Sequence, residues 1–272
     1  MMLDTATRSP ALRRHGLTMV IDPGLPTAAF ADLVDSHGWL VDLVKFGWGT
    51  ALVTRDLARK TAILREHGVG YYFGGTMFER YVWDGRLDEF VQLATRHAVS
   101  YVEVSNGTIP MDPGTKAEYV RLLAQRFPVI SEVGSKDAGR AATLGAEQWV
   151  QEILADQAAG AVLVTTEARE SGRAGVARPD GTLRTDVLDA ILAVVESDRL
   201  LFEAPTKELQ VELIRRVGPL VNLGNIAPHD VVGLETLRLG LRGDTLLDVA
   251  APRPAGAQRP RPVGAARPAS AA

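Results

Sequence analysis

The chain has 272 residues, 46% of them hydrophobic and 23% charged, and its lack of cysteine excludes disulfides and cysteine metal sites. The formal net charge of −3 provides no broad basic field, so we expect no nucleic-acid partner. No apolar run reaches the ~20 residues of a membrane span, and the N-terminus lacks the apolar core of a signal peptide, so we expect a cytoplasmic protein without membrane contact.

Eight short apolar runs, rich in Val, Ile and Leu, are spaced along the chain. In chain order they cover residues 17–22, 41–45, 69–75, 99–103, 128–132, 161–167, 200–203 and 219–222. Runs of this length, bounded by turn residues, are typical of strands buried on both faces, as in parallel sheets. Glycine-containing turns at residues 47–50 and 74–76 follow the second and third runs and predict tight loops.

Segments with helical spacing separate these runs. They cover residues 27–37, 54–67, 86–97, 114–126, 146–159, 185–197, 205–216 and 228–240. Eight strands alternating with eight helices in about 250 residues predict a (β/α)₈ TIM barrel. A doubly wound open sheet is the alternative, but no Gly-x-Gly-x-x-Gly turn follows the first strand.

The barrel is expected to be the single domain of the chain, over residues 13–250. Residues 1–12 are predicted to be a flexible N-terminus. Residues 251–272 consist almost wholly of Ala, Pro, Gly and Arg, which offer little apolar surface to offset the entropy of ordering. We therefore predict a disordered C-terminal tail.

Acidic side chains close several of the predicted strands. Glu103, Glu132 and Glu203 end the fourth, fifth and seventh runs, and Glu167 closes the sixth. Because parallel strands present their carboxyl ends at one mouth of a barrel, we expect these carboxylates to converge. Like charges in a partly dry cavity need a cation or protons, and carboxylate oxygens suit Mg²⁺. We predict a Mg²⁺ site on Glu103, Glu132 and Glu203.

Two lysines accompany these acids. Lys45 ends the second run, and Lys136 follows the fifth. A lysine in such a place can form a Schiff base, hold a phosphate or carboxylate, or donate a proton, and we predict that both are catalytic. The alternative is that Lys45, Lys136 or Arg169 only neutralises the acids in structural ion pairs, which suits Lys45 better than Lys136.

Anion-binding residues are predicted at three further places. Arg169, Ser171 and Gly172 follow the sixth run, and Arg242 and Gly243 lie near the end of the last helix. Arginine matches phosphate or carboxylate with two hydrogen bonds, and glycine lets the backbone approach, although such turns also serve merely as helix ends. Asn222 ends the eighth run, which makes its amide a further candidate substrate contact.

Loop motifs accompany nearly all of these positions, including Val44-Lys-Phe-Gly-Trp-Gly-Thr50 and Gly74-Gly-Thr-Met-Phe-Glu79. The others cover residues 16–25, 102–107, 132–136, 169–172, 202–205, 221–226 and 234–245. Together, over about residues 13–248, they closely resemble the phosphosulfolactate synthase family.

The resemblance implies a (β/α)₈ barrel that adds sulfite to phosphoenolpyruvate in a Mg²⁺-dependent reaction, giving (2R)-phospho-3-sulfolactate. It also implies a carbon–sulfur lyase, a homo-oligomer, and a general acid at Lys136. From chemistry and position, Arg169, Ser171 and Arg242 would hold phosphate, and Lys45 would orient the carboxylate or sulfite.

Some positions depart from the family pattern. Pro23 stands where the family usually has lysine, Asn106 where archaeal relatives often have Asp, and Ala168 where they often have Gly. Residues 135–144 also differ from the archaeal loop. Two alternatives remain: another barrel lyase acting on an enol phosphate or 2-oxo acid, and a non-catalytic stress-associated relative, against which the costly strand-end acids argue.

Overall fold

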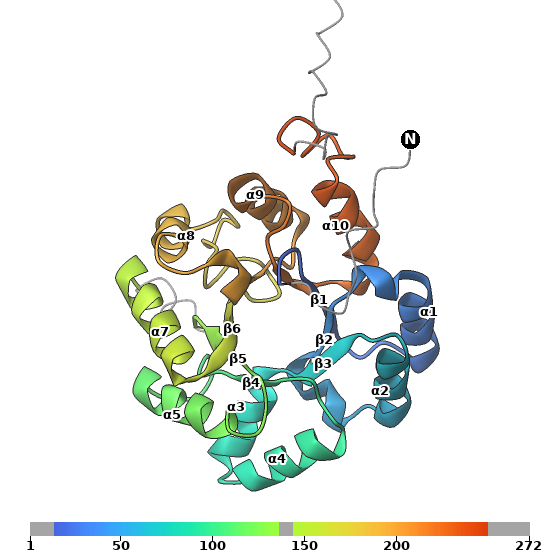
Figure 1. The fold of residues 1–272 in the computed structure, drawn as a ribbon, viewed down its shortest axis with the longest axis vertical. Coiled ribbons are helices and arrows are strands. Elements are labelled where there is room, and N and C mark those ends of the chain that lie inside the picture. Colours follow the sequence, from blue (N-terminus) through green and yellow to red (C-terminus); the bar gives the residue numbers. More distant parts are fainter. Residues whose placement is uncertain (1–13, 136–143, 250–272) are drawn as a thin grey trace, which may run out of the picture.

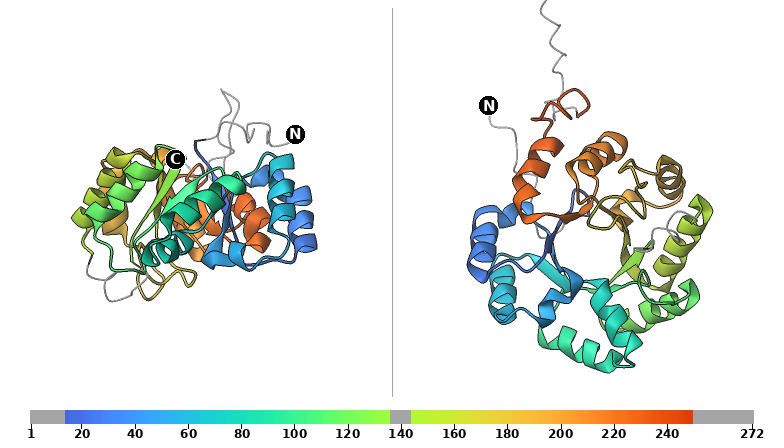
Figure 2. Two further views of the ribbon diagram at one scale, coloured as in Figure 1. Left: turned by 90° about the horizontal axis from the view of Figure 1, so that it is seen from below. Right: turned by 180° about the vertical axis from the view of Figure 1, so that it is seen from behind.

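The computed structural model describes residues 14–135 and 144–249, so the predicted N-terminal segment and C-terminal tail lie outside the described residues. Eight parallel strands form a nearly closed barrel surrounded by helices (Figures 1 and 2). The strands are β1 (Thr18–Asp22), β2 (Leu43–Phe46), β3 (Gly70–Phe73), β4 (Val102–Val104), β5 (Val129–Val133), β6 (Ala161–Thr166), β7 (Leu200–Glu203) and β8 (Leu223–Ile226). Their order, β3-β2-β1-β8-β7-β6-β5-β4, leaves β3 and β4 at the seam, where Ser100 N donates to Tyr71 O at 2.9 Å. The predicted TIM barrel is confirmed.

Helices cover the outside of the barrel and return the chain from the carboxyl end of one strand to the start of the next (Figure 2). They are α1 (Thr27–His37), α2 (Leu57–Glu66), α3 (Gly75–Trp83), α4 (Leu87–Arg96), α5 (Pro113–Leu123), α7 (Ala146–Ala159), α8 (Thr185–Leu192), α9 (Lys207–Val217) and α10 (Val231–Arg238). Each predicted helical segment coincides with or overlaps one of them. No helix among the described residues has the length and apolar character needed to cross a membrane.

The sequence did not predict helix α3. The turn expected at residues 74–76 is tight, since Gly74 alone separates β3 from α3, but the helix begins there at Gly75. After β2, the expected turn is part of a 3₁₀ helix, η4 (Gly47–Leu52). Tertiary packing explains α3, because Phe78 is fully buried and its ring lies edge-on to Phe90 at 5.8 Å and to Tyr119 at 5.5 Å. Such contacts stabilise α3, although the glycines at its start suggest a turn rather than a helix.

The eighth strand was predicted four residues too early, at 219–222. In the structure β8 spans Leu223–Ile226 and pairs with β1 and β7, so Leu223 lies opposite both Thr18 and Phe202. Its Gly224 suggests a turn in the sequence, but a Cβ at that position would lie 2.8 Å from Met19 Cε. Glycine is therefore used here for close packing inside the barrel.

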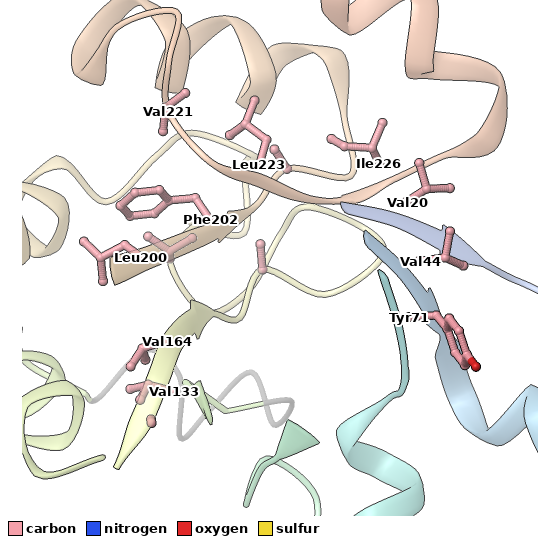
Figure 3. Close-up of a cluster of buried hydrophobic side chains, with 14 of the residues drawn as sticks. Val20, Val44, Tyr71, Val133, Val164, Leu200, Phe202, Val221, Leu223 and Ile226 are labelled. Atoms are coloured by element: carbon pink, nitrogen blue, oxygen red, sulfur yellow. The ribbon is translucent and has the colours of Figure 1, made fainter. Parts of the chain in front are cut away.

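Two hydrophobic layers flank the strands. The outer layer lies between the sheet and the helices, and Figure 3 shows Val20, Val44, Val164, Phe202 and Leu223 within it. A smaller cluster fills the barrel itself and consists of Met19, Leu43, Tyr72, Ile130, Leu163 and Leu201. Strands covered on both faces explain the continuous apolar runs in the sequence.

Candidate active site at the carboxyl end of the barrel

A layer of polar side chains lies inside the barrel, next to the smaller hydrophobic cluster and on its carboxyl-end side. Side chains on a strand return to the same face every second residue. Two positions beyond the apolar residues Leu43, Ile130, Leu163 and Leu201 come Lys45, Glu132, Thr165 and Glu203. These positions face the barrel axis at its carboxyl end, where barrel enzymes place their chemistry.

Lys45 is the centre of this layer. Its Nζ lies 3.0 Å from Glu103 Oε2, 3.1 Å from Glu132 Oε2 and 3.4 Å from Glu203 Oε1. Burial acts to lower the pKa of Lys45, but the three carboxylates outweigh it and raise the pKa well above its ordinary value. The metal-free site therefore favours the ammonium form of Lys45, and the convergence of acids expected from the sequence is present.

A second grouping of carboxylates overlaps the first. One oxygen each from Glu132, Glu167 and Glu203 lies within 4.8 Å of the others, and all three side chains are buried. Hard oxygen donors at this spacing fit a divalent cation such as Mg²⁺, which takes a few carboxylates and completes its shell with water and substrate oxygens. The structure therefore groups Glu167 with Glu132 and Glu203, where the sequence had suggested Glu103.

Glu103 is held differently. Its Oε2 pairs with Lys45 and accepts a hydrogen bond from the backbone N–H of Gly75, the first residue of α3. Its Oε1 and the hydroxyl of Tyr72 are both buried without a hydrogen-bond partner in the described part of the chain. Burial raises the pKa of Glu103 to about 7 despite Lys45, and burial with the nearby Glu103 carboxylate raises the pKa of Tyr72. Buried polar atoms without partners are rare and require an explanation such as a functional role or a bound water.

An open cavity of about 460 Å³ lies over this layer. It is lined by Ile21, Lys45, Gly47, Trp48, Gly74, Gly75, Thr76, Thr108, Glu132, Glu167, Arg169, Glu170, Glu203 and Asn225. Trp48, Arg169 and Asn225 have φ values of 51°, 53° and 53°, and they are three of the four non-glycine residues with positive φ in residues 14–135 and 144–249. Backbone strain of this kind concentrates at functional sites.

Buried charges fix the loops around the cavity. Asp22 Oδ1 accepts hydrogen bonds from the N–H groups of Gly24 and Leu25, and its Oδ2 lies 2.6 Å from the fully buried Nζ of Lys60. Glu79 on α3 accepts from the N–H groups of Thr108, at 2.7 Å, and Ile109, at 2.8 Å. These bonds hold the loops after β1 and β4 in one conformation.

Sequence reasoning did not single out Lys60 or Glu79. Lys60 had a detectable signal, because it shares the buried face of α2 with Leu57, Thr61 and Leu64. A lysine on an apolar helix face needs a buried partner, although the sequence does not identify which one.

The loop after β6 brings part of the predicted anion site to the cavity. Arg169 lines it, and Arg169 N donates to Glu167 Oε1 at 2.6 Å. Ser171 is exposed and Gly172 is buried in the same loop, and neither is among the lining residues. Gly172 has a φ of +63°, and a Cβ there would lie 2.9 Å from Thr206 Cγ2.

Arg242 and Gly243 are not brought to the cavity. Neither residue is among those that line it, and a Cβ on Gly233, in the first turn of α10, would lie 3.6 Å from Arg242 Nη1. Arg242 Nε lies 4.0 Å from Asp244 Oδ2, and the backbone carbonyl of Asp244 accepts a hydrogen bond from Arg215 on α9. This segment therefore packs against α9, and the anion-binding role expected for Arg242 and Gly243 stays a prediction.

Asn222 is likewise placed away from the cavity by the later start of β8. Its side-chain amide donates to the carbonyl oxygens of Arg14 and Leu200 at 3.0 Å each, and its Oδ1 accepts from Leu17 N. These bonds tie the starting ends of the strands together. Asn225, which sequence reasoning overlooked, lines the cavity instead.

Lys136, the predicted proton donor, lies outside the described residues. The chain is described up to Ser135, which is buried just beyond β5. The site seen in the described residues thus combines the buried ammonium of Lys45, three carboxylates suited to a hard cation, and Arg169. This set can bind a divalent cation together with an anionic ligand.

Comparisons with known proteins agree on a single family. The family model described as (2R)-phospho-3-sulfolactate synthase (ComA) matches residues 6–244. A phosphosulfolactate synthase of Bacillus subtilis is 45% identical over 244 residues, which cover 89% of this chain and 97% of the relative. One of Methanothermobacter thermautotrophicus is 40% identical over 246 residues, covering 89% and 95%.

Solved structures show similarity of fold alone. The 3-hexulose-6-phosphate synthase of Salmonella typhimurium superposes with a TM-score of 0.52 at 14% identity, covering 82% of this chain and 99% of that one. The thiamine phosphate pyrophosphorylase of Pyrococcus furiosus gives a TM-score of 0.52 at 10% identity, covering 83% and 95%. At such identities the shared architecture carries no information on substrate.

Proposed function

The chain belongs to the (2R)-phospho-3-sulfolactate synthase family, and we propose that it catalyses the Mg²⁺-dependent addition of sulfite to phosphoenolpyruvate, giving (2R)-phospho-3-sulfolactate. The reaction would make it a carbon–sulfur lyase. The observation that carries the proposal is the buried trio Glu132, Glu167 and Glu203 beside the ammonium of Lys45, at the floor of a cavity in the size range of small-molecule sites.

The reaction places specific demands on this site. Sulfite sulfur forms a bond to C3 of the enol phosphate, the electron pair of the C2=C3 bond moves towards C2 and the carboxylate, and a proton on C2 completes the product. Negative charge develops on the carboxylate, where fixed positive charge lowers the barrier most. A divalent cation held by Glu132, Glu167 and Glu203 would supply that charge.

The side chains contribute binding and orientation. Lys45 stays protonated, so its role is to hold the carboxylates in place and to present positive charge to an anionic substrate. Arg169, held at the rim by the left-handed backbone of its own loop, is placed to bind phosphate or sulfite oxygens. Lys136 is assigned as the general acid from the family pattern.

The raised pKa of Lys45 argues against the Schiff-base alternative at this residue. An imine forms from the neutral amine, and three carboxylates within 3.4 Å stabilise the charged form. Borohydride trapping with pyruvate tests the alternative directly, because an imine enzyme is inactivated covalently and the proposed synthase is not.

Product analysis tests the proposed reaction. The protein is incubated with phosphoenolpyruvate, sulfite and Mg²⁺, and phosphosulfolactate is followed by mass spectrometry. We expect product only when all three are present, none after chelation with EDTA, and a large loss in Lys136→Ala. Lys207→Ala, which removes an exposed lysine paired with Asp244, is the matched control and should keep full activity. Absence of metal-dependent product would refute the reaction, and full activity in Lys136→Ala would refute the assigned acid.

A further inference from the structure

A buried ion pair lies between α5 and α7, on the outer side of β5. Lys116 Nζ is 2.7 Å from Asp156 Oδ2, and the two side chains are 0% and 1% exposed. Neither residue lines the cavity. Burying two charges costs so much solvation that an apolar pair of similar size is often equally stable. Stability alone therefore does not account for this arrangement.

The pair is bonded to the end of β5. Lys116 Nζ donates to the backbone carbonyl of Glu132 at 3.1 Å, and Asp156 Oδ2 accepts a hydrogen bond from Ser131 Oγ. Two helices are thereby joined to two consecutive residues of one strand. The second of these residues, Glu132, carries a carboxylate of the proposed cation site.

The pairing of β5 with β4 stops before it reaches Glu132. The ladder between β4 and β5 ends where Val104 lies opposite Ser131, one residue before Glu132. On the other side, β6 continues beside β5 as far as Val133. Lys116 thus supplies a hydrogen bond to Glu132 beyond the last pair with β4.

We propose that Lys116 and Asp156 are positioning residues for the divalent cation site, which they serve by fixing the backbone of Ser131 and Glu132. The inference rests on the proposed function in one respect, namely that Glu132 is a cation ligand. Removing a residue that orients a metal ligand typically weakens metal affinity by about 10- to 100-fold.

A double variant separates positioning from stability. Lys116→Met with Asp156→Leu replaces both fully buried charges by apolar side chains and keeps the partly exposed Glu152, whose Oε2 lies 3.9 Å from Lys116 Nζ in the wild type. We expect its Tm to change by no more than about 4 °C, while the Kd for Mn²⁺ without substrate, measured by electron paramagnetic resonance, rises roughly 10-fold. Ile153→Val, one turn earlier on α7 and fully buried, is the matched control, in which Tm falls and the Kd stays unchanged.

The outcomes are distinct. A folded double variant that binds Mn²⁺ as tightly as the wild type overturns the positioning role and leaves the proposed function intact. A wild type that binds no Mn²⁺ overturns both. Ser131→Ala removes one link without touching either charge, so if the double variant does not fold, an unchanged Kd in Ser131→Ala overturns the inference, and a raised Kd at unchanged Tm supports it.

Discussion

At the scale of single residues, Lys45 determines the charge balance of the barrel mouth. It is buried against three carboxylates that would otherwise repel one another in a low-dielectric site. The family relationship alone does not reveal this arrangement, because a lysine at a strand end is equally compatible with a Schiff base or a phosphate contact. Its geometry favours a fixed counter-ion.

Removal of Lys45 should therefore destabilise the protein strongly. We expect Lys45→Met to lose about 3–5 kcal/mol of unfolding free energy in the absence of metal, because buried carboxylates lose their partner. Lys207→Met is the matched control, since Lys207 forms an exposed ion pair with Asp244 and its loss should cost less than about 1 kcal/mol. Urea denaturation measures both, and equal losses would contradict the role given to Lys45.

Glu103 should make the stability of the metal-free protein depend on pH. Burial raises its pKa from 4.5 to about 7, so between these values the folded protein keeps a proton that the unfolded chain has released. The unfolded state then binds fewer protons, and stability from this group falls as pH rises from 4.5 to 7. Denaturation of wild type and Glu103→Gln across this range should show their difference moving in favour of the variant. A difference independent of pH would contradict the raised pKa.

At the scale of secondary-structure elements, the loops after the strands give the site its shape. The loop after β6 turns back on itself so closely that Gly175 lies against the backbone of Glu167, where an added Cβ would be 1.8 Å from Glu167 O. Val176 N donates to the same carbonyl at 2.8 Å. The carboxylate of Glu167 and the guanidinium of Arg169 are thus presented by a loop with little freedom to move.

Two alanine substitutions in this loop test the importance of the close contact between Gly175 and the backbone of Glu167. Gly175 and Gly181 both have positive φ, at 65° and 89°, so alanine costs each about 1 kcal/mol through backbone strain. A Cβ at Gly181 meets nothing closer than 4.0 Å, whereas one at Gly175 collides with backbone. We expect Gly175→Ala to lower Tm and activity well beyond Gly181→Ala. Equal effects would show that the loop adapts to the added Cβ.

The strands and helices were predicted more completely than the ligand set. The barrel, its helices and the convergence of acids followed from continuous apolar runs, the helical spacing between them and strand polarity, which can be read from the sequence. The ligand set was only partly predicted, because the sequence does not show that Glu103, within β4, pairs with Lys45 and Gly75 while Glu167, just beyond β6, lies beside Glu132 and Glu203. The start of β8 was misplaced because Gly224 and Asn225 have turn-like character that packing inside the barrel overrides.

At the scale of the whole molecule, the outer helices hold the mouth of the barrel through buried charges. Lys60 on α2 reaches Asp22 at the end of β1, and Lys116 on α5 reaches the end of β5. These partners are separated by 38 and 16 residues in sequence, so no local pattern identifies them. Buried lysines of the outer helices therefore bond directly to the strand ends that surround the carboxylates of the site.

Cation binding should stabilise the whole fold, since the cation binds only the folded arrangement of Glu132, Glu167 and Glu203. Mg²⁺ at one hundred times its Kd is expected to add about 2.7 kcal/mol of stability, seen as a rise in Tm by calorimetry. Sodium chloride at equal ionic strength serves as the control for screening. Glu167→Gln should lose most of the rise, and a rise retained in this variant would exclude Glu167 from the site.

The position of the bound cation would show whether Glu132, Glu167 and Glu203 form the cation site. Crystals grown with Mn²⁺ and phosphoenolpyruvate would show the ion by its anomalous scattering. We expect one peak about 2.0–2.3 Å from carboxylate oxygens of Glu132, Glu167 and Glu203, with Lys45 still paired to Glu103. A peak coordinated by Glu103 in place of Glu167, or no ion at the floor of the cavity, would contradict this ligand set.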